Sequence, residues 1–143
     1  MSDRPSLTIR RRFAAPPAAV FSAWTEATQL ARWFGPARVT VVEAEADARV
    51  GGRFHVVMRE TSSGEEHRVG GVYREVVPNE KLTFTWAWRS TPERESLVTV
   101  TLAGDGDGTA LTLTHERFFD DATRERHQGG WSGSLDKLAA LFS

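Results

Sequence analysis

Six segments between residues 38 and 117 alternate apolar and polar side chains, and this period of two is the feature that most constrains the fold. Residues typical of tight turns separate the segments, as at Gly51-Gly52 and Pro78-Asn79-Glu80. Connections this short join antiparallel neighbours, because parallel strands need long crossovers. We therefore expect an antiparallel meander with strands near residues 38–46, 53–60, 67–77, 81–88, 96–103 and 109–117.

Three shorter patterns precede the meander. Alternation over Leu7–Phe13 predicts a first strand with a charged outer face. Apolar residues at helical spacing predict a short helix over Pro16–Trp24, and proline is acceptable in its first turn. A second short helix, capped by Thr25 or Thr28, is expected to end at the Gly35-Pro36 pair.

The last segment has the pattern of a long closing helix that begins after Asp120 or Asp121 as N-cap. Its apolar positions, which we expect to be buried, are Trp131, Leu135, Leu138 and Phe142. Three glycines, each costing about 1 kcal/mol in a helix interior, interrupt it at positions 129, 130 and 133. This cost favours a close approach of the backbone to the sheet or to a ligand, and a kink or a later helix start is the alternative.

Length and composition exclude several classes of protein. A chain of 143 residues is expected to form a single domain over residues 1–143. Its net charge of -1 argues against binding of nucleic acid or of an anionic membrane, and with Cys 0 it has no disulfide or thiolate chemistry. Neither a histidine pair at metal-ligand spacing nor a cofactor motif is present, so no metal and no cofactor are expected. The polar, arginine-rich start and the lack of a long apolar run indicate a cytoplasmic protein without a signal peptide.

Six short motifs, in order along the chain, are shared with one known family. They are Trp33-Phe34-Gly35-Pro36, Gly51-Gly52-Arg53-Phe54, Gly71-Val72-Tyr73-Arg74-Glu75-Val76, Leu82-Thr83-Phe84-Thr85-Trp86, Leu111-Thr112-Leu113-Thr114-His115, and Gly130-Trp131 with Leu135-Asp136-Lys137-Leu138. From Leu7 to Phe142 the chain resembles bacterial single-domain homologues of the C-terminal domain of the activator of heat-shock protein 90 ATPase, within the START-like (SRPBCC) superfamily. The resemblance implies an α+β helix-grip fold like that of the birch-pollen allergen. In this fold a seven-stranded antiparallel sheet wraps around the long C-terminal helix, and two short helices follow the first strand.

Such folds usually leave a cavity between sheet and helix, and alternation indicates which side chains face it. Leu82, Phe84, Trp86 and Trp88 share one strand face, and Leu111, Leu113 and His115 share another. Chain reversal at each turn brings the ends of three strands, the segment after the second helix and the start of the last helix to one end of the sheet. We expect eight side chains to contact a ligand there: Phe34, Met58, Tyr73, Trp86, Trp88, His115, His127 and Trp131.

Each of these residues also has a purely structural interpretation. The aromatic residues are typical of core packing, and His115 could be a core histidine bonded to a backbone carbonyl. His127 could be a surface residue of the helix. For Tyr73, the strand pattern leaves open whether it or Val72 points inward, because both faces contain apolar side chains.

Binding of a small hydrophobic or aromatic ligand is the function that the residues favour, with His115 as the main polar contact. A polyketide aromatase/cyclase-like enzyme is one alternative, but no second catalytic group accompanies His115. A co-chaperone-like domain that binds heat-shock protein 90 or a client is another, without ATPase stimulation because the stimulating N-terminal domain of those activators is missing. Association with a second copy of the chain as a homodimer is compatible with each of these three functions.

Overall fold

Seven strands form one antiparallel sheet in the order β1-β7-β6-β5-β4-β3-β2 in the computed structural model, which describes residues 4–142. Residues 1–3 and 143, at the two ends of the predicted domain, lie outside the described residues. The strands are β1 (Leu7–Phe13), β2 (Val39–Ala46), β3 (Arg53–Glu60), β4 (Glu66–Val77), β5 (Lys81–Trp88), β6 (Ser96–Asp105) and β7 (Gly108–Glu116). The predicted meander is confirmed. β1 forms one edge of the sheet and pairs with β7 from Leu7↔His115 to Phe13↔Thr109.

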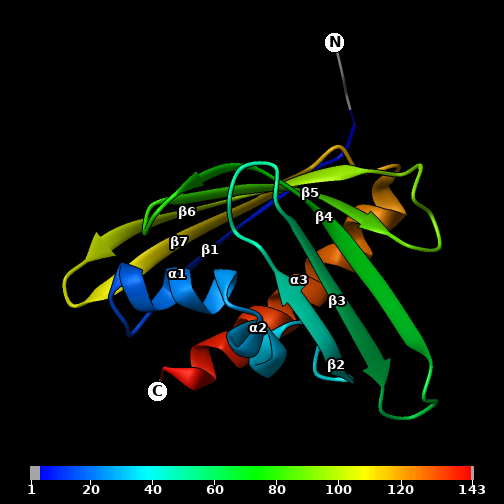
Figure 1. Ribbon diagram of the computed structural model, residues 1–143, viewed down its shortest axis with the longest axis horizontal. Coiled ribbons are helices and arrows are strands. Elements are labelled where there is room, and N and C mark those ends of the chain that lie inside the picture. The colour runs from blue at the N-terminus through cyan, green and yellow to red at the C-terminus, as the bar shows by residue number, and fades with distance from the viewer. Residues whose placement is uncertain (1–3, 143) are drawn as a thin grey trace.

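Three helices lie on the concave side of this sheet: α1 (Pro17–Thr25), α2 (Ala27–Trp33) and α3 (Asp121–Leu141). Figure 1 shows the sheet arching over α3, with α1 and α2 beside the C-terminal half of that helix. The α+β helix-grip architecture expected from the family resemblance is therefore confirmed. The concave side encloses the core, where Val20, Trp33 and Leu113 are completely buried.

The start of α2 differs from the sequence prediction. Its N-cap is Glu26, whose side chain makes no capping hydrogen bond, so the expected cap at Thr25 or Thr28 is wrong. Thr25 closes α1 instead, where its hydroxyl donates to the Phe21 carbonyl at 2.9 Å. Only one residue separates the two helices, which leaves no room for a separate capping turn.

Helix α3 begins as predicted, because the Asp120 carboxylate accepts from the Thr123 amide at 2.8 Å. Trp131, Leu135 and Leu138 are buried, whereas Phe142 is only half-buried and meets the edge of Phe13. This apolar face fixes α3 against the sheet and the two short helices.

Of the three glycines of α3, only Gly133 approaches the rest of the chain closely. A Cβ atom on Gly133 would lie 3.3 Å from the Pro36 Cα, whereas one on Gly129 or Gly130 would meet nothing within 4 Å. The prediction of close approach is therefore wrong for Gly129, which faces open space outside any pocket lining. Gly130 borders a pocket between α3 and the sheet, so its close approach to a ligand stays a prediction. Among residues 4–142, no helix has the length and apolar character needed to cross a membrane.

Candidate functional site

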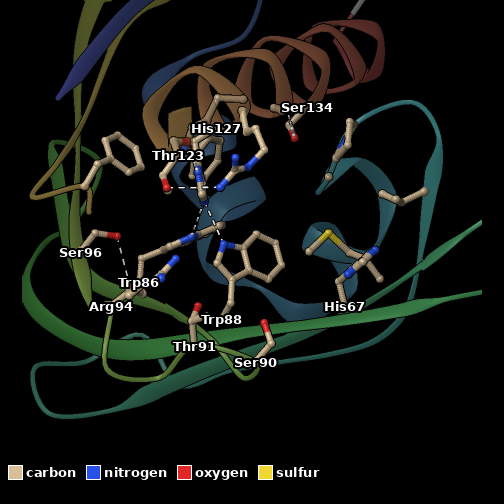
Figure 2. A pocket seen from close by; sticks show the side chains of 18 of the residues that line it. His67, Trp86, Trp88, Ser90, Thr91, Arg94, Ser96, Thr123, His127 and Ser134 are labelled. Atoms are coloured by element: carbon tan, nitrogen blue, oxygen red, sulfur yellow. Dashed lines mark hydrogen bonds between the residues drawn. The ribbon is translucent and has the colours of Figure 1, made fainter. Parts of the chain in front are cut away.

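A pocket of about 350 Å³ opens between the sheet and α3, at the end of the sheet where β5 finishes. The β5–β6 loop forms one side with Ser90, Thr91 and Arg94, and the first half of α3 forms the other (Figure 2). The segment that joins α2 to β2 contributes Phe34 and its neighbours to the wall. The end of the sheet at which sequence reasoning placed the mouth is therefore where the pocket lies.

The inner wall is aromatic. Trp86 lies at its centre, with ring centroids 5.1 Å from Trp131, 5.6 Å from Trp88 and 5.8 Å from Phe34. Met58 of β3 is also part of the lining. Six of the eight residues singled out from the sequence line this pocket: Phe34, Met58, Trp86, Trp88, His127 and Trp131.

His127 is the imidazole that α3 contributes to the pocket wall, and both of its nitrogens have partners. Its Nδ1 lies 2.8 Å from the Thr123 carbonyl oxygen, one helical turn earlier, and can only donate to it. Nε2 is then the acceptor, and it receives the indole N–H groups of Trp88 at 2.9 Å and Trp86 at 3.3 Å. Burial lowers the pKa of His127, which the bond to Thr123 partly offsets. The ring is thus held neutral, with the proton on Nδ1.

His115 lies behind this wall and is not one of the lining residues. The ring is completely buried, as the alternation of β7 predicted. Its Nδ1 accepts from Trp131 Nε1 at 3.0 Å, so its Nε2 donates to Ser96 Oγ at 2.7 Å. Ser96 in turn donates to the Trp86 carbonyl at 3.3 Å. Burial, with a smaller effect of His127, lowers the pKa of His115 well below its usual value.

This chain of hydrogen bonds, from Trp131 through His115 and Ser96 to Trp86, leaves the His115 ring no free nitrogen for a ligand. The sequence-based assignment of His115 as the main polar contact of the pocket therefore does not match the geometry. His115 instead accepts from the indole of Trp131 and packs against the indole of Trp86, with ring centroids 5.5 Å apart.

Tyr73 also lies outside the lining, although its side chain is the inward one at this point of β4. Its ring packs against Phe54 and Phe84, at centroid distances of 5.9 and 6.1 Å. A register shift in the pairing of β4 with β5, between Tyr73 and Glu75, accompanies this packing. Burial raises the pKa of the Tyr73 phenol. Tyr73 thus belongs to the core beneath the sheet.

Sequence reasoning missed several polar residues of the site. Thr123 and Ser134 fall on the same face of α3 as His127 and Trp131, so helical spacing from those two could have found them. Arg94 comes from the β5–β6 loop, whose path the sequence does not indicate. Ser96 reaches His115 only because β6 pairs with β7 so that Val98 stands opposite His115.

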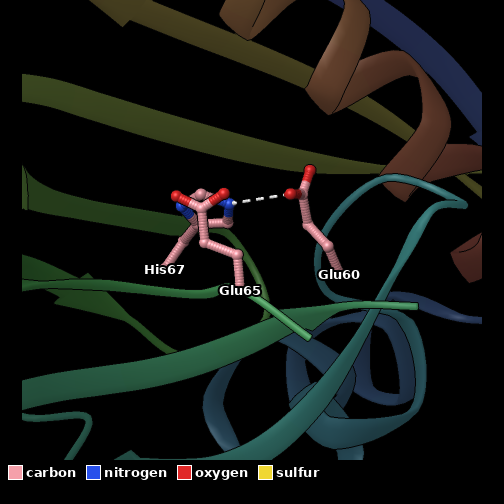
Figure 3. Close-up of side chains that lie close together, drawn as sticks. All are labelled: Glu60, Glu65 and His67. Carbon is pink, nitrogen blue, oxygen red and sulfur yellow. Dashed lines mark ion pairs between the residues drawn. The ribbon is translucent and has the colours of Figure 1, made fainter. Parts of the chain in front are cut away.

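A second cluster, formed by Glu60, Glu65 and His67, borders the pocket (Figure 3). Their potential ligand atoms lie within 4.8 Å of one another, which is close enough for shared binding of a cation. Glu60 is already engaged, because Arg38 lies 3.2 Å and His67 lies 3.7 Å from its carboxylate. The hydrogen bond from Arg38 holds the pKa of Glu60 below its usual value. A metal ion here would therefore have to compete with Arg38.

The comparisons with known proteins agree with this architecture. The family described as Activator of Hsp90 ATPase homolog 1-like protein matches residues 14–143. An X-ray structure of a protein from Chromobacterium violaceum is 32% identical, with a TM-score of 0.87 over 96% of this chain and 97% of that chain. The crystal structure of the AHSA1 protein from Silicibacter pomeroyi is also 32% identical, with a TM-score of 0.85 over 96% of each chain. Among curated proteins, no match was found.

Proposed function

The chain belongs to the Activator of Hsp90 ATPase homolog 1-like family, and we propose that it binds a small hydrophobic or aromatic molecule in the pocket between the sheet and α3. The observation that carries the proposal is the open, aromatic-walled space beside Trp86, Trp88 and Trp131. A volume of about 350 Å³ falls within the range of small-molecule sites, which are mostly apolar with a few polar groups.

The arrangement of the imidazoles favours binding over catalysis. A general base needs a free lone pair that faces the substrate, and the Nε2 atom of His127 already accepts from two indoles. His115 is closed off behind the wall. The aromatase/cyclase alternative therefore finds no unengaged imidazole nitrogen at His115 or His127.

Fluorescence titration tests the proposal. N-phenyl-1-naphthylamine is a neutral aromatic probe, and in the pocket it would gain emission while quenching Trp86 and Trp88. Gly130→Leu should weaken its binding by tenfold or more, because Gly130 lines the pocket and faces open space. The matched control is Gly129→Leu, which lies about 100° around α3 from Gly130 and outside the pocket lining, and which should bind the probe like the unaltered protein.

Both substitutions replace a helix glycine with a good helix former, so neither should reduce stability. Loss of binding in Gly130→Leu alone would support the pocket as the binding site. Equal binding in both variants, or no binding to the unaltered protein, would contradict the proposal.

A further inference from the structure

We infer that the molecule bound in this pocket is an amphipathic anion, with an apolar or aromatic body and an oxyanion such as a carboxylate. The inference rests on the proposed function and specifies the chemistry of its ligand. Two independent features carry it: the charges around the pocket and a surplus of N–H donors on its wall.

The formal charges among the described residues that line the pocket are all positive, although Glu60 and Glu65 lie beside the pocket next to His67. Three arginines line it, Arg38, Arg94 and Arg126, and no aspartate or glutamate is found among the described residues that do so. This differs from the chain as a whole, in which acidic and basic residues nearly balance at a net charge of -1. An anion entering the pocket would meet guanidinium groups, which bind carboxylates through paired N–H donors.

Arg94 and Arg126 are the two arginines free to make this contact. Arg38 already pairs with Glu60 at 3.2 Å. Arg94 lies 3.9 Å above the ring of Phe119, and Arg126 donates to the Thr123 hydroxyl at 3.3 Å. Neither arginine forms an ion pair with another residue of the described range 4–142.

Asp120 is an acidic residue on which both of these arginines act electrostatically. Its carboxylate accepts from the amide and the hydroxyl of Thr123, at 2.8 and 2.6 Å. These bonds are the main cause of its lowered pKa, and the charges of Arg126 and Arg94 contribute less. Asp120 is thus occupied as the cap of α3 and does not line the pocket, which leaves an excess of positive charge at the rim.

The donor surplus lies at His127. A neutral imidazole offers one lone pair in the ring plane, yet Trp86 and Trp88 both direct their N–H groups at Nε2. One lone pair cannot fully satisfy two donors, so one indole N–H is left with part of its hydrogen-bonding capacity unused. Both indoles line the pocket, and an acceptor oxygen of a ligand would satisfy the remaining capacity.

Dodecanoate and dodecanol test the charge requirement, because they share a chain and differ only in the head group. Each would displace N-phenyl-1-naphthylamine, below the critical micelle concentration, from the unaltered protein and from the double variant Arg94→Gln/Arg126→Gln. We expect dodecanoate to bind about tenfold more tightly than dodecanol, the low end for charge-assisted bonds at an exposed rim. The double variant should lose that advantage and bind dodecanol unchanged, whereas Arg53→Gln, an exposed residue outside the lining, should keep it.

The outcomes separate the two proposals. Equal affinity for dodecanoate and dodecanol, or an advantage that survives in the double variant, would overturn the anion inference while ligand binding stands. Failure of the probe and of both competitors to bind would overturn the proposed function, and the inference with it. If Arg53→Gln lost the affinity advantage of dodecanoate to the same extent, the advantage would come from the net charge of the protein and not from Arg94 and Arg126. That result would also overturn the inference.

Discussion

Replacing Ser96 by alanine should destabilise the protein by about 1 to 3 kcal/mol, the cost of leaving a buried hydrogen-bonding group unpaired. The substitution removes the oxygen that lies 2.7 Å from His115 Nε2, and the His115 ring is completely buried. A change of tautomer does not help, because a proton on Nδ1 would then face the N–H of Trp131. Either arrangement leaves one buried N–H or lone pair without a partner.

A double-mutant cycle isolates this effect from the loss of the serine itself. In a His115→Leu background, Ser96→Ala no longer strands an imidazole, and only the 3.3 Å bond to the Trp86 carbonyl is lost. The Ser96→Ala substitution should therefore cost at least about 1 kcal/mol less there than in the unaltered protein. Urea unfolding followed by tryptophan fluorescence and circular dichroism measures both values, with the exposed Ser90→Ala as a control within about 0.5 kcal/mol. Equal costs in the two backgrounds would refute the hydrogen-bond chain as described.

Three further measurements test the packing, the cap and the buried imidazoles. Leu138→Ala should cost about 2 to 5 kcal/mol in urea unfolding because the side chain is completely buried, and a loss below about 1 kcal/mol would contradict its place in the core. Asp120→Ala should lower the unfolding free energy by about 1 kcal/mol through loss of the N-cap, with the neighbouring Asp121→Ala within about 0.5 kcal/mol, and equal effects would contradict the capping role. Burial lowers the pKa of His115 and of His127 in the folded state, so stability should be complete above about pH 6.5 and fall below it. The slope contributed by each ring should not exceed about 1.4 kcal/mol per pH unit, and a flat profile from pH 7.5 to 5 would contradict two buried neutral rings.

The sheet was predictable from the sequence because alternation and turn residues are local properties. The faces assigned to β5 and β7 agree with the burial of Phe84, Trp86, Leu113 and His115. Helix α3 was likewise predictable from its spacing and its cap. The caps of the short helices were not, because a threonine suited to capping can serve equally well as the last residue of the preceding helix, as Thr25 does.

The division between pocket wall and core could not be read from the sequence. The alternation of side chains along β7 showed that His115 points inward. Whether it meets a ligand or another side chain depends on the pairing of β6 with β7, which brings Ser96 to it. Arg94 and Arg126 lie in a loop and on a helix face, where exposure alone gives no reason to place two residues together. Such distant juxtapositions are fixed by tertiary structure and not by local pattern.

The β5–β6 loop has a consequence for how this pocket can change during evolution. Residues 89–95 contain no buried side chain, yet Ser90, Thr91 and Arg94 from this loop line the pocket. Substitutions there can alter the shape and charge of the pocket with little loss of folding free energy, because no core contact is removed. The wall formed by Trp86 and Trp131 is tied into the core and is far less free to vary. If the pocket binds a ligand as proposed, the ligand preference could therefore change by mutation of the loop while selection for stability retains the wall.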